Sequence, residues 1–249
     1  MSFFHEVYYV AWGDLRYMRH TFKNILISSL VTPILYLLAF GYGLRVGADV
    51  GGVPYIDFVI PGVIALSCLS SSFAATSTRL NVQRLYYRCF DEMMMCPLSN
   101  PAIICGKALI GVCRGLLSSA LIFTIGWVLE PSYLFLTPLL ILTVILASFT
   151  FSMLGVMCAL LARSHAAMTT FSSLVITPMT FLCGTFFAID SLPAWAQGVL
   201  YCLPLSEASS CIRAAALGFD FPFWALGVLA LFFCIFFSVN LYLIKNRKI

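Results

Sequence analysis

The sequence predicts an all-α polytopic membrane protein that forms a single transmembrane domain over residues 1–249. Of its 249 residues, 61% are hydrophobic and only 10% are charged. An average soluble domain is about 45–50% apolar and about 25% charged. A soluble fold cannot bury the larger number of apolar residues of this chain beneath a polar surface. This composition excludes an ordinary soluble enzyme, a disordered chain and a nucleic-acid-binding module. Alternating segments of about 10 residues, which are typical of a β-barrel, do not occur.

Six apolar stretches have the ~20 residues that a helix needs to cross a bilayer. They cover roughly residues 24–44, 58–78, 107–129, 133–160, 167–189 and 222–244. Their sum leaves no room for a separate soluble domain.

The basic residues predict the orientation of these spans, because cytoplasmic loops carry an excess of Lys and Arg. Twelve of the 14 fall on one side: Arg16, Arg19, Lys23, Arg79, Arg84, Arg88, Lys107, Arg114, Arg163, Lys245, Arg247 and Lys248. The other side holds only Arg45 and Arg213. We therefore expect both termini to be cytoplasmic.

Residues 1–23 do not form a signal peptide, because the first apolar run starts too late and is as long as a full span. Instead they predict an interfacial helix. Its apolar arc contains Phe4, Val7, Tyr8, Ala11, Leu15, Met18 and Phe22, and Arg16, His20 and Lys23 lie opposite. Such a helix rests on the inner leaflet with its basic face towards the lipid headgroups. The alternative is a cytoplasmic lead-in that packs on its own bundle.

We expect no metal, cofactor or nucleotide to bind to this chain. The ten cysteines contain no Cys-x-x-Cys pair and the three histidines are scattered, so no zinc or haem ligand set is present. Only Cys202 and Cys211 fall clearly on the outer side, where they are candidates for a disulfide. Gly106-Lys107 is followed by Ala108 and lacks the upstream glycine of a Walker A sequence.

The span centres are almost free of charge, which argues against intramembrane acid–base chemistry. Asp57, Arg79 and Arg114 are placed near predicted span ends, where snorkelling accounts for them.

The cytoplasmic loop, residues 79–106, is predicted to contain a helix of its own. Arg84 to Cys96 contains no Gly or Pro and predicts a helix of three turns that stops at Pro97. Asn100 then predicts the start of the next helix. Aromatic residues, methionines and both charge signs suit docking into a groove on another protein and equally suit a helix lying on the membrane surface.

The outer segment, residues 190–221, predicts two short apolar helices. Pro193 opens the first, which runs to about Cys202; Pro204 separates the two, and the second ends at Gly218. Each piece has about half of the ~20 residues needed to cross. They therefore predict a re-entrant hairpin dipping into the outer leaflet, or else a cap at the membrane surface.

Small and hydroxyl residues in the second span permit close helix packing or line a polar path. The hydroxyl residues are Ser67, Ser70, Ser71, Ser72, Thr76, Ser77 and Thr78. Gly111-x-x-x-Gly115 in the third span also fits a close helix contact. Prolines within spans one and five, Pro33 and Pro178, predict kinks there.

The chain resembles a known family along its whole length. It is similar to the permease subunits of ABC-2-type exporters, particularly the branch that exports drugs, polysaccharides and nodulation lipo-oligosaccharides. The resembling residues are Phe58-Val59-Ile60-Pro61-Gly62, Glu92-x-x-x-x-Pro97-Leu98-Ser99, the run from Thr177 to Phe187, Leu192-Pro193, Leu203-Pro204 and Arg213. The chain departs from the family at Leu203, where many relatives have Asn, and at Cys183, where relatives often have a small residue.

The resemblance implies a working unit of two permeases and two separate ATPase subunits, with ATP and Mg held by the ATPases. It implies that the Arg84–Cys96 helix is a coupling helix whose Asp91 and Glu92 face a basic groove of the ATPase. The implied coupling residues are Arg84, Tyr87, Arg88, Asp91, Glu92 and Pro97. Those implied to border the path or the outer gate are Pro33, Ser67, Ser71, Pro178, Gly184, Phe187, Pro193, Pro204 and Arg213.

The predicted function is therefore that of a multi-pass permease of the plasma (inner) membrane. It exports an amphipathic, lipid-like, glycan or drug-like substrate by alternating access, in contact with membrane lipids and with no nucleic acid. The alternative is an ATP-independent secondary carrier or channel. A membrane enzyme would need polar residues clustered at one membrane depth, and the sequence assembles none.

Overall fold

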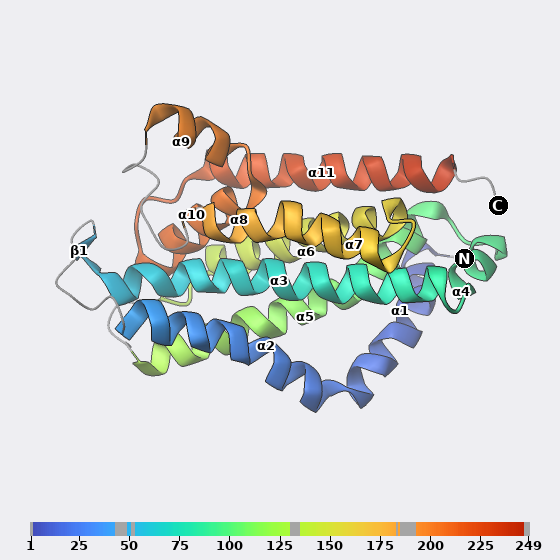
Figure 1. The fold of residues 1–249 in the computed structure, drawn as a ribbon, viewed down its shortest axis with the longest axis horizontal. Coiled ribbons are helices and arrows are strands. Elements are labelled where there is room, and N and C mark those ends of the chain that lie inside the picture. The colour runs from blue at the N-terminus through green and yellow to red at the C-terminus, as the bar shows by residue number, and fades with distance from the viewer. Residues whose placement is uncertain are drawn as a thin grey trace.

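The computed structural model describes residues 2–42, 49–50, 53–129, 135–182, 184 and 193–246, and these form an almost entirely helical bundle (Figure 1). The first elements are α1 (Phe3–His20), α2 (Phe22–Tyr36), the π-helical turn η1 (Leu37–Tyr42), strands β1 (Asp49–Val50) and β2 (Val53–Pro54), α3 (Tyr55–Leu85), α4 (Cys89–Met95) and α5 (Asn100–Leu129). They are followed by α6 (Pro138–Leu161), α7 (His165–Phe171), the π-helical turn η2 (Ser172–Ile176), α8 (Thr177–Leu182), α9 (Ala194–Tyr201), α10 (Pro204–Leu217) and α11 (Phe223–Lys245). The two short strands pair antiparallel, with Asp49 opposite Pro54.

Five stretches of the described chain are long and apolar enough to cross a membrane. They are α2 with the start of η1, most of α3, α5, α6 and α11, and they make the chain a multi-pass membrane protein. The predicted span 167–189 is helical from His165 to Leu182 as the run α7–η2–α8, which is not among these five. The end of that predicted span lies outside the described residues, apart from Gly184.

The predicted end of the second span is wrong, because α3 continues to Leu85 instead of ending near residue 78. The predicted start of the next helix at Asn100 is confirmed, because α5 begins there. The helix predicted over Arg84–Cys96 is shorter, because only Cys89–Met95 forms α4. Arg88 separates it from α3 by adopting a left-handed conformation, with φ of 55°. A left-handed residue cannot continue a right-handed helix.

The centre of the bundle is formed by α3, α5 and α6, whose backbones approach closely through small residues. A Cβ atom at Gly111 would overlap the Thr76 hydroxyl, and one at Gly115 would overlap the Ser72 hydroxyl. Gly155 of α6 packs on the same part of α3, where an added Cβ atom would lie 3.1 Å from the Thr76 Cβ. The Gly111-x-x-x-Gly115 contact is confirmed, and this part of the hydroxyl series in α3 serves close packing.

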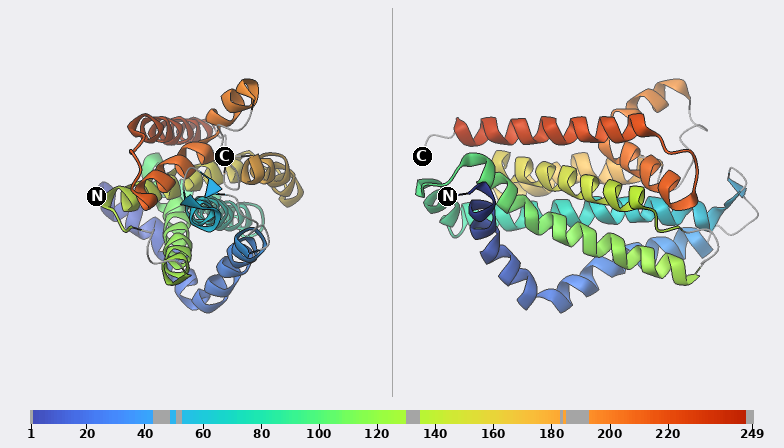
Figure 2. Two further views of the ribbon diagram at one scale, coloured as in Figure 1. Left: turned by 90° about the vertical axis from the view of Figure 1, so that its left-hand side faces the viewer. Right: turned by 180° about the vertical axis from the view of Figure 1, so that it is seen from behind.

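α2 and α11 lie at the edge of the bundle (Figure 2). Only 17% of the residues in the apolar, membrane-spanning stretch of each helix are buried. Their exposed apolar side chains include Ile27, Val31, Leu35, Leu231 and Ile235. Apolar side chains that face outward along a helix of spanning length are suited to contact with lipid tails.

A proline lies beside each π-helical turn. Pro33 lies in α2, shortly before η1, and Pro178 lies in the first turn of α8, directly after η2. Pro178 has no N–H to bond the carbonyl of Leu174, which lies within η2. Both features loosen the regular helix at the two predicted kinks, and π turns are frequent at functional sites.

Both chain ends lie at the same end of the bundle, together with α4 and the link between α6 and α7 (Figure 1). The short strands and α9 lie at the opposite end. Most of the basic residues predicted to face the cytoplasm therefore share one end.

The outer segment forms two helices, α9 and α10, close to the predicted bounds. Pro204 occupies the first turn of α10, and Gly218 ends it in a left-handed conformation with φ of 73°. α10 is largely buried against α3, α6 and α11. Cys202 is exposed and Cys211 is buried, and both are free thiols, so the candidate disulfide is not formed.

Candidate functional site

α1 packs on the bundle through a narrower face than its apolar arc predicts. Val10 and Ala11 are buried against α5, while Phe4, Tyr8 and Trp12 are exposed. The contact requires Gly106 on α5, because a Cβ there would lie 2.6 Å from Val10 Cγ1. The alternative of a lead-in packed on its own bundle is thus correct for one face of α1, and the exposed aromatic residues leave the other face suited to an interface.

A buried polar cluster joins α1, α3 and α5, and it is centred on Asp14. One carboxylate oxygen of Asp14 accepts hydrogen bonds from Arg79 Nε at 3.0 Å and from Gln83 Nε2 at 2.6 Å. The other accepts from Lys107 Nζ at 2.9 Å, and Lys107 also donates to Gln83 Oε1 at 2.8 Å. The Arg79 guanidinium lies 4.1 Å from the centre of the Tyr17 ring. Because every charged member has a hydrogen-bonded partner, the cluster clamps three helices rather than leaving a buried charge.

A second contact fixes the start of α1 to the start of α5. The Glu6 carboxylate accepts hydrogen bonds from the Ser99 backbone N–H at 3.1 Å and from its hydroxyl at 2.5 Å. These hydrogen bonds favour the ionised carboxylate and lower the pKa of Glu6. α1 is therefore held at both its first turn and its middle.

Arg84 is the predicted coupling residue with the best-defined contacts, and they lie within the bundle. One terminal nitrogen, Nη1, donates to the carbonyl oxygens of Ala159, Leu160 and Ala162, at 2.6, 2.8 and 2.9 Å. These belong to the last turn of α6, where carbonyls lack partners within the helix. Phe90 of α4 is also buried in the core. Arg84 thus ties the end of α3 to the end of α6, and Phe90 anchors α4 in the core beside them.

The other predicted coupling residues lie at the surface of the α3–α5 connection. Tyr87, Arg88, Glu92 and Pro97 are exposed, and Asp91 is half-buried in the first turn of α4. The structure therefore brings together an exposed aromatic residue, a cation and an acid at the end of the bundle that carries both termini.

Three predicted path residues, Pro33, Ser67 and Ser71, line one cavity of about 340 Å³ between α2, α3 and α5. Hydroxyl residues dominate its wall, which also contains Ser28, Ser29, Thr32 and Ser70. The Ser67 and Ser70 hydroxyls donate to carbonyls of their own helix at 2.7 and 2.9 Å. One side of the hydroxyl series of α3 thus packs the core, as one of the two predicted roles requires, and the other side lines this cavity.

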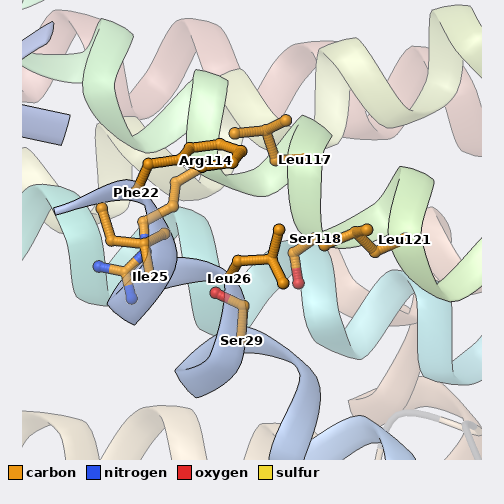
Figure 3. Close-up of a pocket in the computed structure, with 8 residues that line it drawn as sticks. All are labelled: Phe22, Ile25, Leu26, Ser29, Arg114, Leu117, Ser118 and Leu121. Carbon is orange, nitrogen blue, oxygen red and sulfur yellow. The ribbon is translucent and has the colours of Figure 1, made fainter. Parts of the chain in front are cut away.

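Arg114 of α5 lies on the wall of the same cavity. It is at the middle of the helix Asn100–Leu129, roughly 20 Å along the axis from Asn100 at 1.5 Å per residue. A second, smaller cavity of about 60 Å³ adjoins it, lined by Arg114, Ser29, Ser118 and apolar residues of α2 and α5 (Figure 3). Arg114 forms no hydrogen bond or ion pair with the described residues, and its buried Nε has no partner.

At the opposite end of the bundle, Arg213 of α10 joins two predicted gate elements. Its Nη2 donates to the Gly184 carbonyl at 2.9 Å, and its guanidinium lies 3.8 Å from the centre of the Phe58 ring at the start of α3. Gly184 has a φ of 68°, a left-handed conformation that favours glycine. Arg213 therefore ties the second outer helix to the turn after α8 and to α3.

The remaining predicted gate residues are not brought to this contact. Pro178 lies within α8, Pro204 opens α10, and Pro193 is an exposed residue before α9. Phe187 lies outside the described residues. Glu207 of α10, which the sequence interpretation did not select, is fully buried, and neither carboxylate oxygen has a hydrogen-bond partner among the described residues.

Sequence reasoning missed Asp14, Gln83 and the exposure of Arg114 to a cavity. The signal for Asp14 was available, because it lies three residues after Ala11 on the side of the helix that is buried. Arg114 was discounted because it was placed near a predicted span end, where snorkelling accounted for its charge. No pattern in the sequence singled out Gln83, whose role follows only from the meeting of three helices.

Comparison with known proteins gives the family of this chain. The family model for the ABC-2 type transporter matches residues 5–217. The chain is 29% identical over 237 residues to the inner membrane transport permease YadH of Escherichia coli K12, covering 92% of each chain. It is 29% identical to nodulation protein J of Neorhizobium galegae, covering 89% of this chain and 86% of that one. It is 31% identical to nodulation protein J of Rhizobium leguminosarum bv. trifolii, covering 84% and 78%.

The family model covers most of the chain, and these relatives match over most of their own length. The chain belongs to the ABC-2 type transporter family and is one of its membrane-embedded transport components.

Proposed function

We propose that this chain is the transmembrane permease subunit of an ATP-driven exporter. It moves an amphipathic, lipid-like, glycan or drug-like substrate out of the cytoplasm by alternating access. Family membership supports a transport role, and relatives named as a transport permease and as nodulation protein J support export of such a substrate. Since the chain carries no P-loop sequence, ATP and Mg belong to a partner subunit.

The observation that carries the proposal is the attachment of α4. Tyr87 and Arg88 in the turn before α4 are exposed, as is Glu92 on the outer surface of the helix. Phe90 on its other side is buried in the core. Arg84, immediately before the break between α3 and α4, holds the end of α6. A movement imposed on α4 by a docked ATPase is therefore transmitted to two central helices, which favours docking over rest on a membrane surface.

The working unit in this proposal contains two ATPase subunits and a second copy of the permease. The apolar outer faces of α2 and of the α7–α8 run are half or more exposed at Ile27, Leu35 and Leu174, and they are available to lipid or to that second copy. The α7–η2–α8 run is the sixth crossing. Both termini and α4 are cytoplasmic, because they share the basic end of the bundle.

The path in this proposal begins at the hydroxyl-lined cavity between α2, α3 and α5. The outer gate is the α9–α10 hairpin, which dips into the outer leaflet and is held to α3 by Arg213. The large buried face of α10 favours this re-entrant arrangement over a cap on the membrane surface.

The test is co-purification of the tagged full-length chain with a co-expressed P-loop ATPase subunit. We expect the pair to associate, and Glu92→Lys to reduce both association and transport without lowering the Tm of the permease. Asp220→Lys is the matched control, because Asp220 is an exposed acid at the other end of the bundle. Unchanged association and transport in Glu92→Lys would remove α4 as the docking element, and failure of any ATPase to associate would refute the exporter itself.

A further inference from the structure

We infer that the cavity between α2, α3 and α5 binds the anionic headgroup of an amphipathic molecule, with Arg114 as its counter-ion. The inference of a binding site depends only on the geometry of these three helices. The further statement that the bound molecule is the transported cargo rests on the proposed function.

The first step is the charge of Arg114. A guanidinium in a membrane-spanning helix is costly unless it is paired or faces a wet cavity, and such residues mark substrate paths. Arg114 has no acid partner among the described residues, and no Asp or Glu lines either adjoining cavity. The one buried carboxylate of the inner end, Asp14, is already shared by Arg79 and Lys107. No acid of the described part of the chain pairs with Arg114, so a bound anion is a suitable counter-ion.

The second step is the wall of the larger cavity. Hydroxyl residues of α2 and α3 and Arg114 line the same volume of about 340 Å³. The Ser28, Ser67 and Ser70 hydroxyls already donate to carbonyls of their own helices. Ser29 lines both cavities, and its buried hydroxyl has no partner among the described residues, so it is a donor that, with the guanidinium, suits phosphate, sulfate or carboxylate oxygens.

The third step is the smaller, apolar cavity on the other side of the Arg114 side chain. It is lined by Phe22, Ile25, Leu26, Leu117 and Leu121 together with Ser29 and Ser118 (Figure 3). The guanidinium nitrogens lie beside the segment of α2 that carries Phe22 and Ile25. A mostly apolar volume of about 60 Å³ next to the cation accommodates the first methylene groups of a chain. The two cavities together match a molecule with an anionic head and an apolar tail.

The fourth step is access. α2 is mostly exposed, since only 17% of the residues in its apolar stretch are buried, and it forms the outer wall of both cavities. The site is thus separated from the surrounding lipid by a single peripheral helix, which contains Pro33 and is followed by a π-helical turn. An amphipath enters sideways between α2 and α5, without crossing the packed core.

The test is lipid binding to the purified full-length chain in detergent, measured by native mass spectrometry. The probes are dioleoyl phosphatidylglycerol and dioleoyl phosphatidylcholine, which share their chains and differ in net charge. We expect tighter binding of the anionic lipid, a loss of about tenfold in Arg114→Gln and a loss of no more than about threefold in Arg114→Lys, equivalent to about 1.4 kcal/mol for the tenfold change. Arg163→Gln is the matched control, because Arg163 is an exposed cation at the inner end of α6.

Ser71→Leu gives a second variant, since it fills the cavity without altering charge. Both variants are first compared with the wild type by thermal unfolding, and we expect Arg114→Gln to be at least as stable because it removes an unpaired cation. If Arg114→Gln fails to fold, Ser71→Leu alone decides, with an expected loss of anionic-lipid binding. Wild-type affinity for phosphatidylglycerol in both folded variants, or an equal loss for both lipids, overturns the inference. Displacement of the lipid by millimolar inorganic phosphate overturns the assignment to an amphipath.

The ATPase complex then distinguishes cargo from a resident lipid. If phosphatidylglycerol is cargo, it stimulates ATP hydrolysis saturably, and Arg114→Gln shifts the half-saturating concentration by the factor seen in binding. If it is a resident lipid, the rate is unchanged and the same site holds it permanently. Lipid binding to the isolated chain is measured without an ATPase. The binding result can therefore be interpreted even if the exporter proposal fails.

Discussion

The Lys107 ammonium lies 2.9 Å from a carboxylate oxygen of Asp14, and this buried ion pair joins α1 to α5. Arg79 of α3 shares the same carboxylate, so one acid neutralises cations from two transmembrane helices. The N-terminal helix is thereby fixed to the two helices that flank α4. Any motion of α4 that shifts α3 or α5 must also move or break this cluster.

The first prediction is that Asp14→Ala strongly destabilises the chain. The substitution leaves two buried cations without a counter-charge, and breaking a buried pair in this way costs about 3–5 kcal/mol, or a fall in Tm of roughly 10 °C. Thermal unfolding in detergent measures this. Asp220→Ala, which alters an exposed acid, is expected to change Tm by no more than about 1–2 °C. Equal Tm values for the two variants would show that the cluster does not clamp α1.

The second prediction concerns the closely packed centre. Gly111→Ala places a methyl group against the Thr76 and Ser152 hydroxyls, and overpacking of this kind costs about 1–3 kcal/mol. Gly227→Ala in α11 is the matched control, because no atom lies within 4 Å of its new Cβ, and we expect it to be neutral or slightly stabilising. Comparison of the two unfolding temperatures tests the contact. A Gly111 variant as stable as the Gly227 variant would contradict it.

The third prediction is a pH dependence at the start of α1. Hydrogen bonds from Ser99 lower the pKa of Glu6 below 4.5, so their stabilising effect is fully present above that value. It is lost as the pH falls through the lowered pKa of the folded state. Ser99→Ala removes the hydroxyl donor, and we expect faster hydrogen exchange in α1 than in the wild type at pH 7.

The difference between wild type and Ser99→Ala should shrink as the pH falls below about 4.5. Ser164→Ala is a control for loss of a serine at a helix start, because Ser164 begins α7 and its hydroxyl accepts from the Ala167 N–H. That variant should leave exchange in α1 unchanged at every pH. A difference between wild type and Ser99→Ala that is constant with pH would rule out Glu6 as the acceptor that matters.

The fourth prediction separates stability from coupling at Arg84. Arg84→Gln loses hydrogen bonds from a cation to the last turn of α6 and should lower stability by about 1.5–3 kcal/mol. Arg88→Gln, at an exposed neighbour, should leave stability within about 0.5 kcal/mol of the wild type. Chemical denaturation followed by tryptophan fluorescence measures both. If Arg88→Gln proves the more destabilising of the two, Arg84 does not secure α6.

The sequence predicted the features that depend on local chemistry. Span length and hydropathy identified α2, α3, α5, α6 and α11, and Pro204 with Gly218 predicted both ends of α10. Most of the basic residues assigned to one side lie on elements at one end of the bundle. Each of these signals is carried by neighbouring residues and requires no knowledge of tertiary contacts.

Features that depend on helices meeting were predicted less well. The end of α3 was placed too early because its charged last turns read as loop, whereas Arg79 and Arg84 find partners on α1 and α6. The cavity required knowing that α2 faces the Ser67 and Ser71 side of α3. The role of Arg114 as a cavity wall depended on the same arrangement.

The measurement that tests the central claim most directly is transport in proteoliposomes containing this chain with or without its ATPase partner. The account predicts ATP-dependent movement of an amphipathic substrate only when both subunits are present, and loss of that movement in Glu92→Lys but not in Asp220→Lys. Transport by the isolated chain, driven by an ion gradient and independent of ATP, would contradict it.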